Sequence, residues 1–264
     1  MRYEGVLTKM STEITETVQY YLIFESDFIN MNQLLDKRLS ISFLKFQCLN
    51  CKLQKKIFAQ GFCYNCFTTI PQAGEWIRSP ELSKAHLGIE DRDLKFEKEC
   101  QLQPHVVYLA NSSDVKVGVT RKTQIPTRWI DQGAHEAIEI VEVPNRYLAG
   151  ITEVALKSHV SDKTNFRKML TNEIKDLNLE EEREKIKQFI PVETREYYLE
   201  NNKETEIKFP VLQFPKKIKT LNLFKNPYYE GVLKGIKGQY LLFEDGTAFN
   251  VRSHEGYVVE IRIH

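Results

Sequence analysis

Two closely spaced pairs of cysteines constrain the fold of this chain more than any other feature of its sequence. Cys48 and Cys51 form one C-x-x-C pair, Cys63 and Cys66 form a second, and eleven residues separate the two pairs. Each pair presents two thiolates on one side of a tight loop, and two such loops complete a tetrahedron around Zn²⁺. Because sulfur fills all four positions, no position is left for water, and we expect a structural zinc ion.

Other interpretations of the cysteine region remain open. A thioredoxin-like redox role usually employs a single C-x-x-C beside a βαβ pattern. The region can also contact nucleic acid, because lysines and aromatic residues alternate around it: Lys45, Lys52, Lys55, Lys56, Phe58, Phe62 and Tyr64. Those aromatic residues serve equally well as the core of a small zinc module. The fifth cysteine, Cys100, stands alone and is expected to be a small buried hydrophobic residue.

Composition and charge limit the classes of protein to consider. The chain has 264 residues, 42% of them hydrophobic and 28% charged, which is typical of a globular protein with a real core. A net charge of +1 gives no general attraction to nucleic acid, so such binding requires a local basic patch. The first ten residues lack the apolar segment of a signal peptide, and no run approaches the ~18 apolar residues of a membrane span. We therefore expect a cytoplasmic protein that does not contact membranes, and the oligomeric state stays open.

The two ends of the chain resemble each other. The sequence YEGVL at 3–7 recurs at 229–233, and each copy precedes a Gln-Tyr segment with a Leu-aromatic pair, at 19–24 and 239–243. In the C-terminal copy, apolar residues alternate on both sides of Glu-Asp-Gly at 244–246, which favours a β-hairpin. The C-terminal region is thus predicted to be a small β-barrel or sheet. The N-terminal region forms either a sister module or further strands of the same sheet.

These patterns divide the chain into six segments. They are an N-terminal β region (1–46), a zinc knuckle (47–70), a connecting segment (71–104), a central domain (105–175), a charge-rich helical linker (176–204) and a C-terminal β module (205–264). The linker is expected to be a solvated helix that Pro191 interrupts. The predicted fold class is α+β.

The central domain has the order strand, strand, helix, strand, helix. The period-2 rule places Val106, Tyr108 and Ala110 on one face of the strand at 105–110. In the strand at 115–120, Lys116, Gly118 and Thr120 share the face opposite three valines. The polar face has glycine at its middle, where a ligand or another part of the chain can approach closely.

Three further elements follow in this domain. A helix is expected after Pro126, with Arg128 in its first turns, and a third strand at 138–143. A second helix is predicted at 149–160, with Ile151, Val154, Ala155 and Ser158 toward the core and Glu153 on a flank.

This order of residues resembles the GIY-YIG nuclease superfamily, whose small module is a three-stranded antiparallel sheet flanked by helices. The whole chain also resembles an uncharacterised bacterial family that joins a four-cysteine knuckle to a domain of this kind. The correspondence assigns Tyr108 to the tyrosine of the first motif, Gly118 to the second motif, Arg128 to the helix arginine, Glu153 to the metal-binding glutamate and Asn165 to the late asparagine. It covers about seventy residues, so it implies nothing for the terminal β regions.

The resemblance implies a metal-dependent nuclease that hydrolyses phosphodiester bonds in DNA or RNA. Glu153 would hold a catalytic Mg²⁺ or Mn²⁺, which would stabilise the leaving oxygen. Arg128 would bind a non-bridging phosphate oxygen, and Tyr108 would position the attacking water or act as its base. A tyrosine with a pKa near 10 is a poor base at neutral pH unless a nearby cation lowers that pKa. Lys116 is the candidate for that cation.

Two departures from the family pattern leave the enzymatic activity open. Lys116 stands where the second motif has tyrosine, and the first motif reads Val107-Tyr108-Leu109 rather than Gly-Ile-Tyr. The alternatives are a non-catalytic zinc-containing protein that binds nucleic acid through a degenerate site, and a protein-interaction scaffold, which the near-zero net charge favours.

Each candidate residue also has an ordinary structural interpretation. Tyr108 is compatible with a half-buried strand position, and Glu153 with an ion pair to Lys157 on the helix surface. Arg128 can pair with Asp131 or Glu136, and Asn165 can belong to a turn formed with residues 162–164. The isolated histidines are expected at the surface or at helix caps: His105, His135 and His159.

Overall fold

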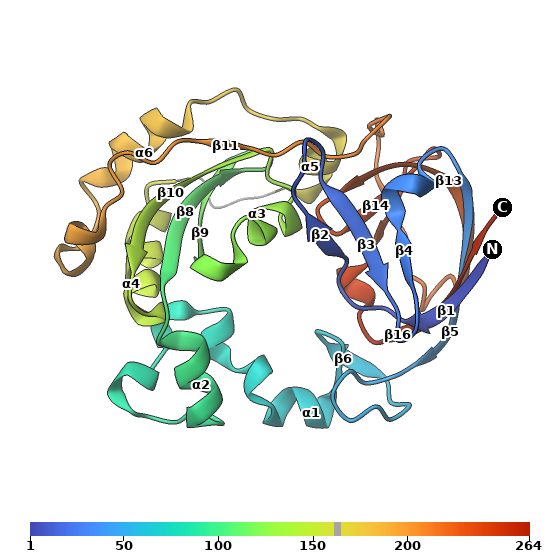
Figure 1. Ribbon diagram of the computed structural model, residues 1–264, viewed down its shortest axis with the longest axis horizontal. Helices are drawn as coiled ribbons and strands as arrows, with labels where there is room; N and C mark the ends of the chain where they lie inside the picture. Colours follow the sequence, from blue (N-terminus) through green and yellow to red (C-terminus); the bar gives the residue numbers. More distant parts are fainter. Residues whose placement is uncertain (161–164) are drawn as a thin grey trace.

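The computed structural model, which describes residues 1–160 and 165–264, contains a barrel-like β unit built from both ends of the chain (Figure 1). Its main sheet has the strand order β1, β16, β5, β13, β14, β15, β12. The bounds of these strands are β1 Arg2–Val6, β5 Arg38–Phe46, β12 Lys219–Thr220, β13 Tyr228–Lys237, β14 Tyr240–Phe243, β15 Thr247–Asn250 and β16 Tyr257–Ile263. A smaller sheet packs on the same core and contains β2 Ser11–Glu13, β3 Gln19–Ile23 and β4 Phe28–Asn30. The two ends of the chain therefore contribute strands to one sheet.

The same β unit occurs twice in this barrel, once near each end of the chain, and the two copies exchange their first strands. The strand β1 pairs with β16 and β13 pairs with β5, so the first strand of each copy pairs with the last strand of the other. The equivalent leucines Leu7 and Leu233 each exchange two backbone hydrogen bonds with the opposite copy. One partner in each exchange has a positive φ, 63° at Asp36 and 81° at Gly256. The repeated YEGVL sequence thus marks two copies related by an approximate two-fold axis.

A four-stranded antiparallel sheet forms the central unit, in the order β11, β10, β8, β9. Its strands are β8 His105–Asn111, β9 Val115–Arg121, β10 Glu136–Val143 and β11 Thr205–Glu206. The first three of these strands occupy the positions expected from the sequence. The short strand β11 pairs with β10 rather than with the barrel, so the C-terminal β region begins later than residue 205.

The two faces of this sheet pack into different cores, as the alternation in the sequence predicts. Val106, Tyr108 and Ala110 join the core shared with the barrel. Val107 and Leu109 face a second core under the helices on the other side. Tyr108 therefore points toward the barrel side of the sheet.

Six α-helices of the described chain surround the two sheets. They are α1 Tyr64–Thr69, α2 Leu94–Gln101, α3 Thr127–Asp131, α4 Arg146–Lys157, α5 Phe166–Thr171 and α6 Leu179–Lys187. The charge-rich linker forms α6 and, after Pro191, a 3₁₀ helix, but α6 is not fully solvated, because Leu179 and Ile186 pack in the second core. Among the described residues, none of these helices has the length and apolar character that crossing a membrane requires.

The predicted orientation of α4 was wrong. Val154 is 50% exposed, whereas Gly150, Thr152 and Glu153 are buried. The reason is that α4 packs on a second partner besides the sheet, the 3₁₀ helix η4 (Pro80–Leu82). Gly150 lies at that contact, against the backbone of Pro80 and Glu81, and Thr152 bonds to Thr194, so hydrophobicity alone does not identify the buried face.

Replacing Gly150 with alanine is expected to destabilise the fold by about 3 kcal/mol. A Cβ atom at this position would lie 2.2 Å from the backbone nitrogen of Glu81, and backbone cannot move aside as a flexible side chain can. The midpoint of urea unfolding measures the effect. Val154→Ala, on the exposed side of the same helix, should change the free energy of unfolding by about 0.5 kcal/mol or less. Equal stability of the two variants would contradict the tight packing of α4 on η4.

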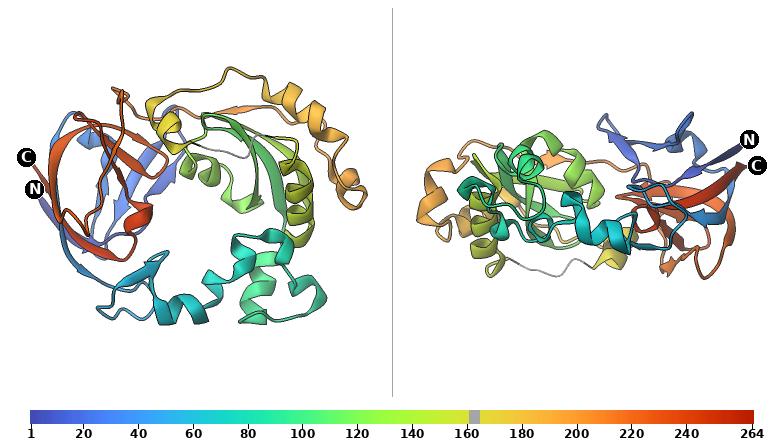
Figure 2. Two further views of the ribbon diagram at one scale, coloured as in Figure 1. Left: turned by 180° about the vertical axis from the view of Figure 1, so that it is seen from behind. Right: turned by 90° about the horizontal axis from the view of Figure 1, so that it is seen from below.

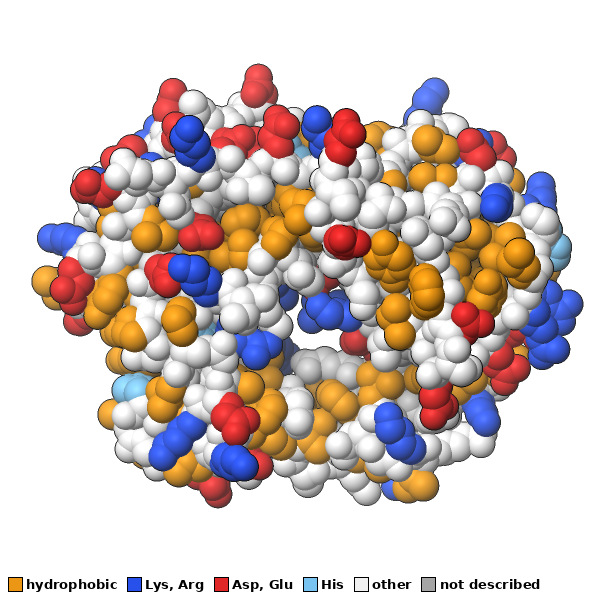
Figure 3. Space-filling view, viewed as in Figure 1, with side chains coloured by type: hydrophobic (Ala, Val, Ile, Leu, Met, Phe, Trp, Pro, Cys, Tyr) orange, Lys and Arg blue, Asp and Glu red, His pale blue; other side chains and the backbone are white. Residues whose placement is uncertain are grey.

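The cysteine region and the connecting segment join the barrel to the central sheet on one side of the molecule (Figure 1). The cysteine region contains the hairpin of β6 Ile57–Ala59 and β7 Phe62–Cys63. The view from behind shows the same arrangement, with the two chain termini adjacent on the barrel (Figure 2). Figure 3 shows a hollow at the centre of the molecule with Lys and Arg side chains at its rim. The barrel and the central sheet therefore border a common basic hollow.

Candidate functional site

The four paired cysteines form one cluster beside the β6–β7 hairpin. Their sulfur atoms all lie within 4.8 Å of one another, and the Sγ atoms of Cys51 and Cys63 are 3.9 Å apart. A tetrahedral site with Zn–S bonds of about 2.3 Å places sulfur atoms about 3.8 Å apart. The cluster can therefore hold a structural metal such as zinc, and the ligands predicted from the sequence are the ones that the fold brings together.

Hydrogen bonds from the backbone favour the thiolate form that a metal requires. Burial raises the pKa of Cys48, but N–H groups of Cys63, Cys51 and Asn50 outweigh it and lower that pKa to about 6. The Asn50 side chain also donates to the Sγ atom of Cys66 at 3.4 Å. Such donors to sulfur are typical of metal knuckles, where they stabilise the negative charge of the ligands.

Tyr108, Gly118 and Arg128 lie together on the barrel side of the central sheet. Tyr108 is directly opposite Gly118, and a Cβ atom at Gly118 would lie 2.6 Å from the tyrosine oxygen. Glycine is therefore required here to accommodate the phenol ring. Arg128, in α3, is close enough for its charge to act on Tyr108. It does not pair with Asp131 or Glu136, because Asp131 binds Lys9 at 2.9 Å and Glu136 binds His135 at 3.1 Å.

The electrostatics of Tyr108 differ from the expectation. Burial raises the pKa of Tyr108, and Arg128, not Lys116, is the cation that partly offsets this effect. Its hydroxyl donates to Oε1 of Gln132 at 3.1 Å. Lys116 is itself largely buried, which lowers its pKa to about 8, and the charge of Arg128 adds to that shift. Arg128 thus has the position expected of the cation beside Tyr108, and the catalytic role of Lys116 stays a prediction.

Glu153 lies on the buried face of α4, where it forms an ion pair with Lys157 at 3.2 Å. Burial raises the pKa of this carboxyl, while the charges of Lys157 and Arg146 lower it. Its charge also acts on Tyr108. Among the described residues, the four cysteines are the one group of three or more His, Cys, Asp and Glu side chains with metal-binding geometry. A divalent cation at Glu153 would thus depend on water and substrate oxygens for its other ligands, as Mg²⁺ sites in phosphoryl chemistry commonly do.

Asn165 caps a helix, and its role in catalysis stays a prediction. Its side chain accepts a hydrogen bond from the backbone nitrogen of Arg167 at 3.0 Å, at the start of α5. The rest of the turn expected at 162–164 lies outside the described residues.

His105 is buried rather than exposed, and the expectation for it was wrong. It begins the central strand β8, and its Nδ1 atom lies 2.7 Å from the carbonyl oxygen of Gln103. That acceptor places the proton on Nδ1 in the neutral ring. Burial lowers the pKa of His105 to about 4.

The stability of the protein is expected to fall in mild acid because of His105. In the unfolded chain this residue binds a proton below about pH 6.5, whereas in the folded chain it does so only near pH 4. Protonation therefore favours the unfolded state, and about 2 kcal/mol is lost between about pH 7.5 and about pH 5. Denaturant unfolding at both pH values measures the loss of unfolding free energy. In His105→Gln this loss should be about 2 kcal/mol smaller than in the wild type. The pKa values of His135 and His254 are also lowered, but both residues are present in the wild type and in the variant. A difference between the two proteins therefore reports on His105, and identical pH dependence would contradict the prediction.

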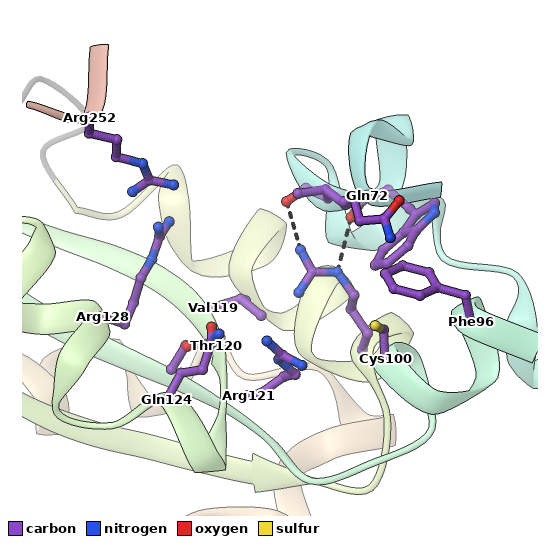
Figure 4. A pocket seen from close by; sticks show the side chains of 12 residues that line it. Gln72, Phe96, Cys100, Val119, Thr120, Arg121, Gln124, Arg128 and Arg252 are labelled. Atoms are coloured by element: carbon purple, nitrogen blue, oxygen red, sulfur yellow. Dashed lines mark hydrogen bonds between the residues drawn. The ribbon is translucent and has the colours of Figure 1, made fainter. Parts of the chain in front are cut away.

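A pocket of about 290 Å³ beside Arg128 was not predicted from the sequence. We call it the arginine pocket because four of its lining residues are Arg121, Arg128, Arg146 and Arg252. Arg128 and Arg252 point toward each other, although they come from the central unit and the barrel (Figure 4). The described lining residues include no Asp or Glu. The signal for this site in the sequence is weak, because four scattered arginines in a chain of near-neutral charge show no pattern.

A family model described as "Protein of unknown function (DUF2797)" matches residues 36–259, well over half of the chain. The chain belongs to the DUF2797 family. The matched segment includes the four cysteines and all four arginines of the pocket. No curated protein and no solved structure matches the chain significantly.

Proposed function

We propose that this DUF2797 protein is a metal-dependent phosphodiesterase that cleaves nucleic acid on the barrel side of the central sheet. The observation that carries the proposal is the position of Arg128, which has no carboxylate partner among the described residues and lies beside Tyr108 and the arginine pocket. An unpaired guanidinium of this kind binds phosphate oxygens and offsets the charge that develops during phosphoryl transfer. The antiparallel order β9, β8, β10, with α3 before β10 and α4 after it, also supports the resemblance to GIY-YIG nucleases.

Each residue of this site has a defined task in the proposed reaction. Arg128 binds a non-bridging oxygen of the scissile phosphate, and Glu153 supplies the carboxylate for a divalent cation. When bound, Mg²⁺ or Mn²⁺ would stabilise the negative charge of the leaving oxygen. Tyr108 orients the attacking water through its hydroxyl. It is a weak base here, because burial raises its pKa.

A second candidate function is binding of nucleic acid without cleavage. The observation that favours it is the environment of Tyr108, which is fully buried and donates its hydroxyl proton to Gln132. A tyrosine held in this way has no free access to a water molecule. Lys116 in place of the second tyrosine of the family motif points in the same direction.

One assay separates the two candidates. The purified protein is incubated with end-labelled single-stranded, duplex and branched DNA and RNA, in Mg²⁺, in Mn²⁺ or in EDTA. The phosphodiesterase proposal expects products that depend on the metal. Binding in a mobility-shift assay without products from any substrate would favour the second candidate. If the protein neither binds nor cleaves any of these substrates, the structural metal cluster is the only chemistry that the described fold supports. A scaffold role would then be preferred.

A further inference from the structure

The arginine pocket presents hydrogen-bond donors and positive charge without acceptors to match them. Thr120 is 3% exposed, lines the pocket, and its hydroxyl has no partner among the described residues. The Nε atom of Arg128 is also buried and has no hydrogen-bond partner among the described residues. Arg146 donates to the carbonyls of Trp76 and Ile77 at 3.0 and 2.8 Å through two of its nitrogens, which leaves the third available. Buried donors without acceptors are costly, so the pocket is suited to an anion rich in acceptor oxygens.

Arg252 reaches this pocket from the barrel, where the fold does not need an arginine. It begins the 3₁₀ helix η8 (Arg252–His254). Its equivalent in the N-terminal copy of the β unit is Asn32, because the offset of 220 residues that relates Gln19 and Tyr20 to Gln239 and Tyr240 also relates these two positions. Asn32 has a structural task, because its amide binds the backbone of Tyr20 and Val18 at 2.9 Å each. Arg252 is exposed, forms no ion pair with a described residue, and points toward Arg128 (Figure 4). The second copy thus replaces a structural asparagine with a cation directed at the central unit.

The number of cations indicates how many phosphates the ligand carries. A guanidinium binds phosphate oxygens in a two-pronged geometry, and a phosphate monoester carries at most about two negative charges. Four arginines therefore match at least two phosphate groups. Phe96 also lines the pocket with a partly exposed ring, which packs on the buried Trp76 at a centroid distance of 6.4 Å, and exposed aromatic rings are the usual stacking surfaces for bases of a single strand.

We propose that the arginine pocket binds consecutive phosphates of a single nucleic-acid strand, and that Arg252 makes the barrel part of this site. The choice of a strand over a free nucleotide rests on the proposed function. The strand passes between the barrel and the central sheet, with Arg252 on one side and Arg121, Arg128 and Arg146 on the other. Arg252 acts in binding rather than in cleavage.

The test measures binding without cleavage. Fluorescence anisotropy of a labelled single-stranded oligonucleotide is recorded in EDTA over a range of salt concentrations. Arg252→Ala should weaken binding about tenfold and reduce the slope of log K against log salt by about 0.7, the value for one phosphate contact on a single strand. Arg195→Ala, which removes another exposed arginine that does not line the pocket, should bind as the wild type does. Inorganic pyrophosphate and a mononucleoside diphosphate are added as competitors and should compete weakly.

The outcomes separate this inference from the proposed function. Binding that depends on Arg252, with no metal-dependent products, supports the pocket and refutes the phosphodiesterase. Cleavage with the same KM in wild type and Arg252→Ala refutes the pocket and leaves the phosphodiesterase in place. Tighter binding of pyrophosphate or the free diphosphate than of the oligonucleotide overturns the choice of a strand. If the Arg252→Ala and Arg195→Ala proteins bind the oligonucleotide with equal affinity, the inference as a whole is overturned.

Discussion

Replacing Cys63 with serine is expected to abolish metal binding and to unfold the segment between residues 47 and 70. The apolar cluster in this segment consists of the cysteines themselves with Ile57, Phe62 and Ile70 packed against them. So small a core cannot hold the loops together without the metal, whose binding contributes about 10 kcal/mol or more in isolated zinc modules. Elemental analysis should show a fall from about one zinc per chain to a small residual fraction. Limited proteolysis should show new cleavage within 47–70 while the barrel stays intact.

The matched control for this prediction is Cys100→Ser. Cys100 lies in α2, outside the cluster, and its replacement should leave the zinc content unchanged. Wild-type protein that contains no metal after purification in zinc-supplemented medium would disprove the site. Retention of a full equivalent of zinc in Cys63→Ser would show that three thiolates suffice, contrary to a closed four-sulfur centre.

Glu153→Gln is expected to reduce metal-dependent cleavage about 100-fold or more. The amide keeps the shape of the side chain but removes the negative charge that would hold the cation, and loss of about 3 kcal/mol of transition-state stabilisation corresponds to this factor. Initial rates at saturating Mg²⁺ measure the effect. Binding of the oligonucleotide in EDTA should not weaken, because the substitution removes a negative charge near a polyanion.

Glu182→Gln is the comparison, because Glu182 is also a helix glutamate paired with a lysine. It pairs with Lys185 on α6, as Glu153 pairs with Lys157 on α4, but α6 contributes no residue to the arginine pocket, whereas α4 contributes Arg146. Its replacement should leave the cleavage rate within about twofold of the wild-type rate. Equal rates in Glu153→Gln and wild type would remove Glu153 from the catalytic site, and the ion pair on α4 would then be its full role.

Local patterns in the sequence were sufficient for the strands and for the metal cluster. The alternation at 105–110 and 115–120 identifies which side chains share a face, because one face of each strand is buried in a distinct core. The cysteine spacing identifies four ligands, because the geometry of a knuckle is local. Both features depend only on residues close together in the chain.

Features that depend on distant segments could not be predicted. The buried face of α4 is set by its contact with η4, about seventy residues earlier in the chain, so the hydrophobic pattern of the helix is misleading. The burial of Tyr108 and His105 depends on the barrel and on neighbouring strands, which no pattern near those residues reveals. The arginine pocket combines β9, α3, α4 and η8, and its members become a site only when the fold is assembled.

The exchange of first strands between the two copies of the β unit has a consequence for biosynthesis. The strand β5 finds its neighbours β13 and β16 only after some 180 intervening residues have left the ribosome. Until then, the N-terminal strands expose unpaired edges, which are prone to pair with other nascent chains. The barrel is therefore expected to fold only after β16 has been synthesised, and a ribosome stalled before residue 227 would carry a nascent chain that depends on chaperones.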